Sequence, residues 1–213
     1  MTMIRRMKLA MLAIATPLAA ATPALAYERL PTGLAKLSPA DFASKVQIVD
    51  DPSEPAIVLS TRDGYKQGRS VKGARAEDVY LQALVDRKTG AVSWRVWHEL
   101  SMGSQRKISS VQYQAGNGKL EQADFLTMDN WLDQCPATDG IGSCNHVVRV
   151  AFELSDETIR EIANAYRPGE RTPWRLRFKE ANGRDILSGI APAEAAGLIN
   201  SLESWSQGGS KSN

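Results

Sequence analysis

The amino-acid sequence predicts an α+β fold built on a β-rich, mostly antiparallel sheet, either a sandwich or a strongly curved sheet. Residues 77–102 have the pattern of a long hairpin, Asn145–Leu154 alternates its faces as a strand does, and two Asn-Gly pairs mark tight turns. A short N-terminal helix, one helix after the Asn145–Leu154 strand and a C-terminal helix complete the prediction. A closed β-barrel with helices is the alternative architecture.

Residues 1–26 have the pattern of a secretory signal peptide. Arg5, Arg6 and Lys8 precede an apolar run, and Ala24-Leu25-Ala26 supplies small residues at a cleavage site. This segment holds three of the 26 basic residues and none of the 24 acidic ones, which leaves 23 basic and 24 acidic side chains. Such an even balance does not indicate nucleic acid as a partner. We expect an exported protein, periplasmic or extracellular, with no transmembrane segment after cleavage.

The rest of the chain is long enough for one core. We expect a single globular domain over residues 27–205 and a disordered tail over residues 206–213. After an extended lead-in, Ser38 can cap a short helix, because the proline that follows is tolerated at the first helical position. Residues 46–49 and 56–61 are strand candidates joined by a turn-rich link.

Residues 62–75 form the most basic loop, with five basic residues, three glycines and one acid. The loop does not match a phosphate-binding P-loop, because three residues rather than four separate Gly64 from Gly68. It is either an anion or polysaccharide contact or a mobile, solvated loop. Its candidate binding residues are Arg62, Tyr65, Lys66, Arg69 and Lys72.

The hairpin over residues 77–102 has a register that its apolar residues determine. A loop over residues 87–90 places the apolar residues of both strands on one face, whereas a slip by one residue would mix the faces. Gly90 suits the positive φ of a tight bulged loop. The facing pairs on the apolar face are Val85/Val92, Ala83/Trp94, Leu81/Val96 and Val79/His98.

The second face of the hairpin pairs Tyr80 with Trp97 and Asp78 with Glu99. Tyr80 and Trp97 are either covered by another element or exposed as an aromatic platform, so both are candidate binding residues. Two facing carboxylates are unfavourable in a sheet, and they offer the pair of acids that glycoside hydrolysis requires. Ordinary strand-end acids are the alternative interpretation.

Turn residues, helix caps and apolar periodicity also predict the elements that follow the long hairpin. Residues 107–113 and 119–125 flank an Asn-Gly turn, but their facing pattern does not resolve. Ser155 can cap the helix that follows the Asn145–Leu154 strand, and residues 173–179 read as a half-buried strand with a basic outer row. The last helix should begin at Pro192, with an apolar stripe on one side.

Cys135 and Cys144 are the only two cysteines. Export to an oxidising compartment favours a disulfide between them. A metal site with His146 would have three ligands at an unfamiliar spacing, so we expect neither a metal nor another cofactor.

No motif in the chain identifies a reaction or a ligand. A nucleophile elbow is absent from the sequence, and both candidate bases, His98 and His146, fall on predominantly apolar strand faces. We therefore expect a non-enzymatic exported module that binds an envelope component or a protein partner through a sheet face or the basic loop. The alternative is a hydrolase acting on cell-wall or polysaccharide substrates.

Overall fold

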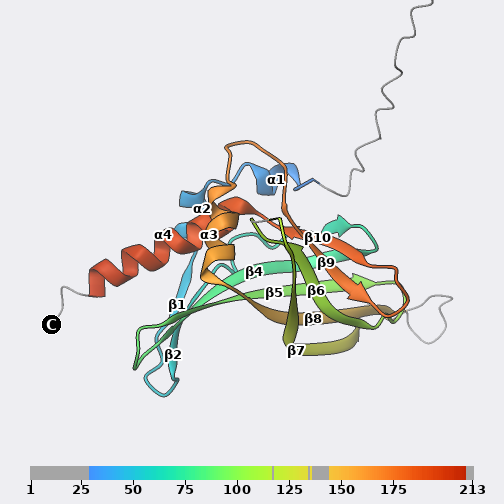
Figure 1. Cartoon of the computed structure of the whole chain (residues 1–213), viewed down its shortest axis with the longest axis horizontal. Coiled ribbons are helices and arrows are strands. Elements are labelled where there is room, and N and C mark those ends of the chain that lie inside the picture. Colours follow the sequence, from blue (N-terminus) through green and yellow to red (C-terminus); the bar gives the residue numbers. More distant parts are fainter. Residues whose placement is uncertain (1–28, 117, 134, 136–143, 210–213) are drawn as a thin grey trace, which may run out of the picture.

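The computed structural model describes residues 29–209, apart from residues 117, 134 and 136–143 (Figure 1). The predicted signal peptide and residues 210–213 lie outside this part of the chain. No helix among the described residues is long and apolar enough to cross a lipid bilayer.

One strongly curled antiparallel sheet forms the body of the molecule (Figure 1). Its neighbours run in the order β1-β2-β4-β5-β8-β7-β6-β9-β10, and β3 pairs with β4 beside this path. The strands are β1 (Gln47–Val49), β2 (Ala56–Ser60), β3 (Arg69–Val71), β4 (Ala74–Asp86), β5 (Val92–Met102), β6 (Ile108–Gln114), β7 (Leu120–Asp133), β8 (Asn145–Leu154), β9 (Trp174–Glu180) and β10 (Ile186–Ile190).

The predicted β-rich, curved antiparallel sheet is confirmed, whereas the closed barrel is wrong. The strands at the two ends of the sheet, β1 and β10, do not pair with each other within the described residues. The nearest approach to closure is a single isolated bridge between Lys72, next to β3, and Leu187 of β10. The sheet is therefore a half-barrel with an open seam between β3 and β10.

The register predicted for the long hairpin is confirmed in β4 and β5. Ala83 faces Trp94, Leu81 faces Val96 and Tyr80 faces Trp97. The loop is held by the carboxylate of Asp86, which accepts hydrogen bonds from the backbone N–H groups of Lys88 and Thr89. Gly90 has a φ of 71° and so occupies the left-handed conformation that glycine adopts without strain.

Helices close one end of the half-barrel (Figure 1). They are α1 (Thr32–Ala35), α2 (Pro39–Ala43), α3 (Asp156–Asn164) and α4 (Pro192–Gly209). Ser38 and Ser155 cap α2 and α3 as predicted, because each side chain accepts a hydrogen bond from a backbone N–H in the first turn. The turn α1 replaces part of the extended lead-in. The last helix reaches Gly209, past the boundary expected at residue 205.

The core lies inside the curl of the sheet. The predicted stripe of α4 and the inner side of α3 join the inward residues of the strands in one cluster, with Trp94 exposed by only 2%. β7 bends between two neighbours: its first half pairs with β6 and its second half with β8. A register shift between Ile108 and Ser110 breaks the alternation of β6, which is why the sequence did not show its faces.

Candidate functional site

A cavity of about 490 Å³ opens at the seam between β3 and β10. We call it the arginine cavity. Its cationic lining residues are Arg29, Arg69, Arg175 and Arg177. The rest of its wall is mainly apolar, with a few neutral polar side chains: Leu30, Ser70, Val71, Gln112, Tyr113, Gln114, Leu120, Pro173, Leu176, Leu187, Ser188 and Gly189. No carboxylate stands among these described lining residues.

The seam exists because β3 and β10 pair at one point only. The backbone N–H of Leu187 donates to the carbonyl of Lys72 at 3.1 Å. Beyond this bridge the guanidinium of Arg69, rather than a backbone group, reaches the carbonyl of Gly189 at 2.5 Å. The arginine cavity occupies the space where further strand pairing would otherwise lie.

Arg69 is a half-buried cation, and the neighbouring carboxyl groups that could balance its charge have raised pKa values. Glu194 of α4 is only 3% exposed, and burial raises the pKa of its carboxyl to about 8. Burial, followed by repulsion from Glu99, also raises the pKa of Asp78. An arginine stays protonated at neutral pH, whereas Glu194 keeps its proton there. The charge of Arg69 is therefore incompletely balanced within the protein.

The position of Glu194 follows from the start of α4. Its Oε1 atom accepts a hydrogen bond from the hydroxyl of Thr61 at 2.6 Å, and that hydroxyl also accepts one from the backbone N–H of Leu81 at 2.9 Å. The carboxyl is thus fixed inside the protein, beside Arg69. Arg69, Asp78 and Glu194 all line one small internal space.

Ser188, on the wall of the arginine cavity, lies 2.8 Å from Nε2 of His98. This contact resembles that between a serine nucleophile and its general base, but His98 is completely buried. Burial, and then the positive charge of Arg69, lower the pKa of His98 to about 3. Its Nδ1 atom has no hydrogen-bond partner among the described residues, so no carboxylate orients the ring. The pair is a poor proton acceptor for acyl transfer.

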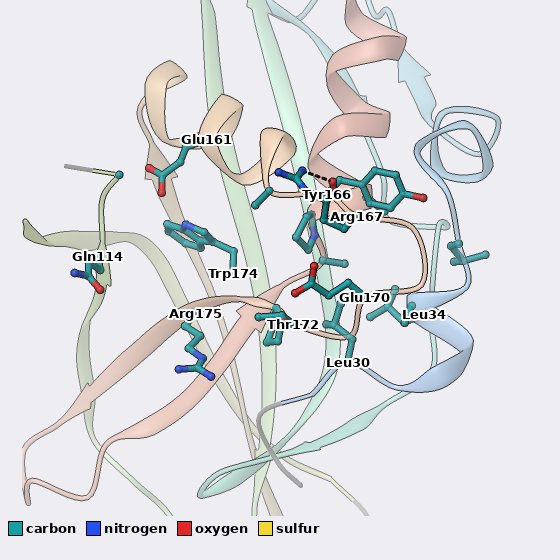
Figure 2. A pocket seen from close by; sticks show the side chains of 18 of the residues that line it. Leu30, Leu34, Gln114, Glu161, Tyr166, Arg167, Glu170, Thr172, Trp174 and Arg175 are labelled. Atoms are coloured by element: carbon teal, nitrogen blue, oxygen red, sulfur yellow. Dashed lines mark hydrogen bonds between the residues drawn. The ribbon is translucent and has the colours of Figure 1, made fainter. Parts of the chain in front are cut away.

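A second cavity of about 610 Å³ adjoins the first and shares Leu30, Gln114, Pro173 and Arg175 with it. We call it the Trp174 chamber. Figure 2 shows Glu161, from α3, and Glu170, from the connection between α3 and β9, at the space that Trp174 lines. The chamber therefore carries both signs of charge, unlike the arginine cavity.

The structure separates the binding residues expected in the basic loop. Arg69 lines the arginine cavity, and Lys72 lies beyond the bridge in a third cavity of about 630 Å³. Lys66 forms an exposed ion pair with Asp63, and the hydroxyl of Tyr65 donates to Gln67. The remaining loop candidate, Arg62, lies over the ring of Tyr80, on the face turned away from the core.

Tyr80 and Trp97 stack with their ring centroids 6.0 Å apart. Tyr80 is buried, whereas Trp97 is partly exposed and donates its indole N–H to Gln82. The facing acids nearby are not an isolated pair, because Arg149 holds Glu99 in an ion pair at 2.6 Å. None of these residues lines the arginine cavity.

Most of the arginine cavity could not be predicted from the sequence. Arg175 and Arg177 were expected only in the outer row of a strand, and Arg29, Ser188 and Glu194 had no predicted role. The alternating arginines were the available signal. These arginines line the same cavity as Arg69 only because the sheet curls to form the seam, and no local sequence pattern predicts that seam.

No cluster of His, Cys, Asp and Glu among the described residues could hold a metal ion. Comparison with protein-family models, with curated proteins and with solved structures finds no match to this chain.

Proposed function

We propose that this protein is an exported, non-enzymatic binding module that holds an anionic ligand with an apolar part in the arginine cavity. The observation that carries this proposal is the lining itself, in which the described residues supply four arginines, a mainly apolar wall and no carboxylate. A volume of about 490 Å³ falls within the usual range of ligand sites.

The electrostatics of Arg69 support an anion rather than a neutral ligand. A partly buried cation is unfavourable unless an opposite charge accompanies it. Glu194 keeps its proton at neutral pH and so does not balance the charge of Arg69, and burial also raises the pKa of Asp78. A bound carboxylate or phosphate would supply the missing charge and could form bidentate hydrogen bonds with the guanidinium.

Export is the part of the proposal that comes from the N-terminal sequence pattern and the cysteine pair. Cys135 and Cys144 are positioned for a disulfide between β7 and β8, which is compatible with an oxidising compartment. An envelope component with an acidic head and an apolar body has the required chemistry.

A hydrolase is the second candidate, and the contact between Ser188 and His98 is the observation in its favour. The binding module is better supported, because a histidine with a pKa of about 3 is a weak base at neutral pH. Labelling of Ser188 by a serine-reactive fluorophosphonate, lost in Ser188→Ala, would favour the hydrolase instead.

Three ligands with the same alkyl chain test the proposed function: decanoate, decanol and decylammonium, titrated calorimetrically below the concentrations at which they form micelles. We expect decanoate to bind, decanol to bind at least about tenfold more weakly, and decylammonium not to bind, because a charged hydrogen bond contributes about 1.5–3 kcal/mol. Equal binding of decanoate and decanol would contradict an anion site.

Matched arginine variants locate the binding. Arg69→Gln and Arg177→Gln should each weaken decanoate binding, whereas Arg62→Gln should leave it unchanged because Arg62 lies over Tyr80. Arg177 is a useful partner variant, since its side chain is 53% exposed and its replacement should not unfold the protein. Unchanged affinity in both cavity variants would exclude the arginine cavity.

A further inference from the structure

The seam presents the edge of a β-strand to the arginine cavity. Leu187 donates its backbone N–H across the seam, and alternate residues of a strand direct their backbone groups to the same edge. Gly189, two residues further along β10, therefore directs its backbone groups into the seam, as the contact between its carbonyl and Arg69 shows. The described residues form one backbone hydrogen bond between the two sides of the seam.

The arginine cavity and the Trp174 chamber lie one after the other along β10. In the pairing of β9 with β10, Arg177 stands opposite Leu187 at the bridge, and Arg175 stands opposite Gly189. Ala191, just past the end of β10, already lines the Trp174 chamber. A path along this edge thus runs from the cationic end at the bridge to the mixed-charge chamber shown in Figure 2.

We propose, on the basis of the proposed function, that the ligand is the carboxyl-terminal segment of a polypeptide that adds as an extended strand along the edge of β10. Its terminal carboxylate lies against Arg177 near the bridge and against Arg69, whose guanidinium then leaves the carbonyl of Gly189 to the peptide backbone. Strand addition combined with capture of a terminal carboxylate is an established mode of peptide recognition.

The direction of the peptide follows from where the charges lie. With its carboxylate beside Leu187 and its earlier residues toward Ala191, the peptide runs opposite to β10, which continues the antiparallel pattern of the sheet. The four steps from Leu187 to Ala191 span about 13 Å, so a segment of about four residues covers the edge.

The Trp174 chamber should also select for a particular kind of residue on the N-terminal side of the peptide's terminal carboxylate. Glu161 and Glu170 line the chamber, and neither forms a salt bridge with a described residue. A lysine or arginine four or five residues before the peptide's end would meet these two acids. The expected ligand therefore ends in apolar residues with a free carboxylate and carries a basic residue shortly before them.

A hexapeptide library with free carboxyl ends tests this inference, read by fluorescence polarisation against the protein. We expect bound sequences with apolar ends, and amidation of the best one should weaken binding at least about tenfold through loss of the charged hydrogen bonds. Decanoate should displace the peptide. Arg69→Gln and Arg177→Gln should weaken the free acid more than the amide, and Arg62→Gln should affect neither.

Methylation of backbone nitrogens tests the strand itself. In a strand only alternate residues direct their N–H groups to one edge, so methylation at one set of alternate positions should abolish binding and methylation at the other set should be tolerated. Equal effects of the two sets, or equal binding of acid and amide, would overturn the inference. Binding of decanoate without binding of any peptide would overturn it while leaving the proposed function standing, whereas failure of decanoate would count against the proposed function.

Discussion

At the scale of single residues, Trp94 is the side chain on which the inner face of the long hairpin depends. It is 2% exposed and donates its indole N–H to Asp156 at 2.9 Å. We expect Trp94→Ala to lower the free energy of unfolding by about 3–5 kcal/mol, as measured by urea denaturation. Trp131, which is 37% exposed, provides a matched tryptophan whose replacement should cost far less. A loss below about 1 kcal/mol for Trp94→Ala would contradict its burial.

Glu194 should give the protein a particular dependence of stability on pH. Its pKa is raised by burial from 4.5 to about 8 in the folded protein. Between these values the unfolded chain has lost the proton and the folded protein keeps it, so unfolding releases a proton and stability falls as pH rises. The limiting slope is about 1.4 kcal/mol per pH unit.

The variant Glu194→Gln removes this pH dependence and leaves the other titrating groups in place. We expect its stability relative to the parent to increase steadily between about pH 4.5 and pH 8 and then to level off, in denaturation series at fixed salt. Glu203→Gln, at an exposed position of α4, is the control and should run parallel to the parent. A parallel course for Glu194→Gln would show that folding does not raise the pKa of Glu194.

At the scale of elements, local patterns were sufficient wherever neighbouring residues determine the structure. The register of β4 and β5 followed from placing the apolar residues on one face, and Ser38 and Ser155 marked helix starts that the structure retains. The strands β6 and β7 were predicted but their facing patterns were not, because a register shift interrupts the alternation of β6 and β7 changes partner halfway along.

The seam could not be predicted from such local patterns. Arg69 and Gly189 are 120 residues apart, and their contact depends on how far the whole sheet curls. Arg69 was a candidate binding residue from the composition of its loop alone. Arg177 and Ser188 could not be connected with it, because the path of strands between them was unknown.

The connection between β7 and β8 offers a prediction at the same scale. Cys135 and Cys144 should be joined, so the intact mass should lie two hydrogens below that of the dithiol form. Reduction should lower the melting temperature without releasing a metal, since closure of a loop of about ten residues contributes roughly 2.5–3 kcal/mol. Double replacement by serine should reproduce the reduced protein. Free thiols in protein taken from an oxidising compartment would contradict the pairing.

At the scale of the whole molecule, an even charge balance conceals an uneven distribution. The arginine cavity and the third cavity, which share Arg177 and Leu187, are together lined by seven basic side chains and one acid, Asp185. Net charge therefore gave no indication of an anionic ligand. The folded arrangement gathers these basic residues around the seam, with Arg69 and Lys72 on the β3 side and Arg175 and Arg177 on the side of β9 and β10.

The predicted export can also be tested on the whole molecule. Because the Ala24-Leu25-Ala26 site predicts cleavage after Ala26, amino-terminal sequencing of the exported protein should begin at Tyr27. Ala26→Pro should block processing and leave a larger precursor, while Ala20→Pro serves as a control away from the site. Met1 at the start of the mature pool would refute export by this route.

If the arginine cavity holds an anion, as we propose, the arginine side chains that line it should respond to the ligand. The Nε–H resonances of isotope-labelled protein, assigned with single Arg→Gln variants, should be followed by NMR during a titration with decanoate. The signals of Arg69 and Arg177 should shift together along one saturating curve, and those of Arg62 and Arg160 should stay in place. Shifts confined to Arg62, or the absence of any saturating shift at Arg69, would contradict the claim.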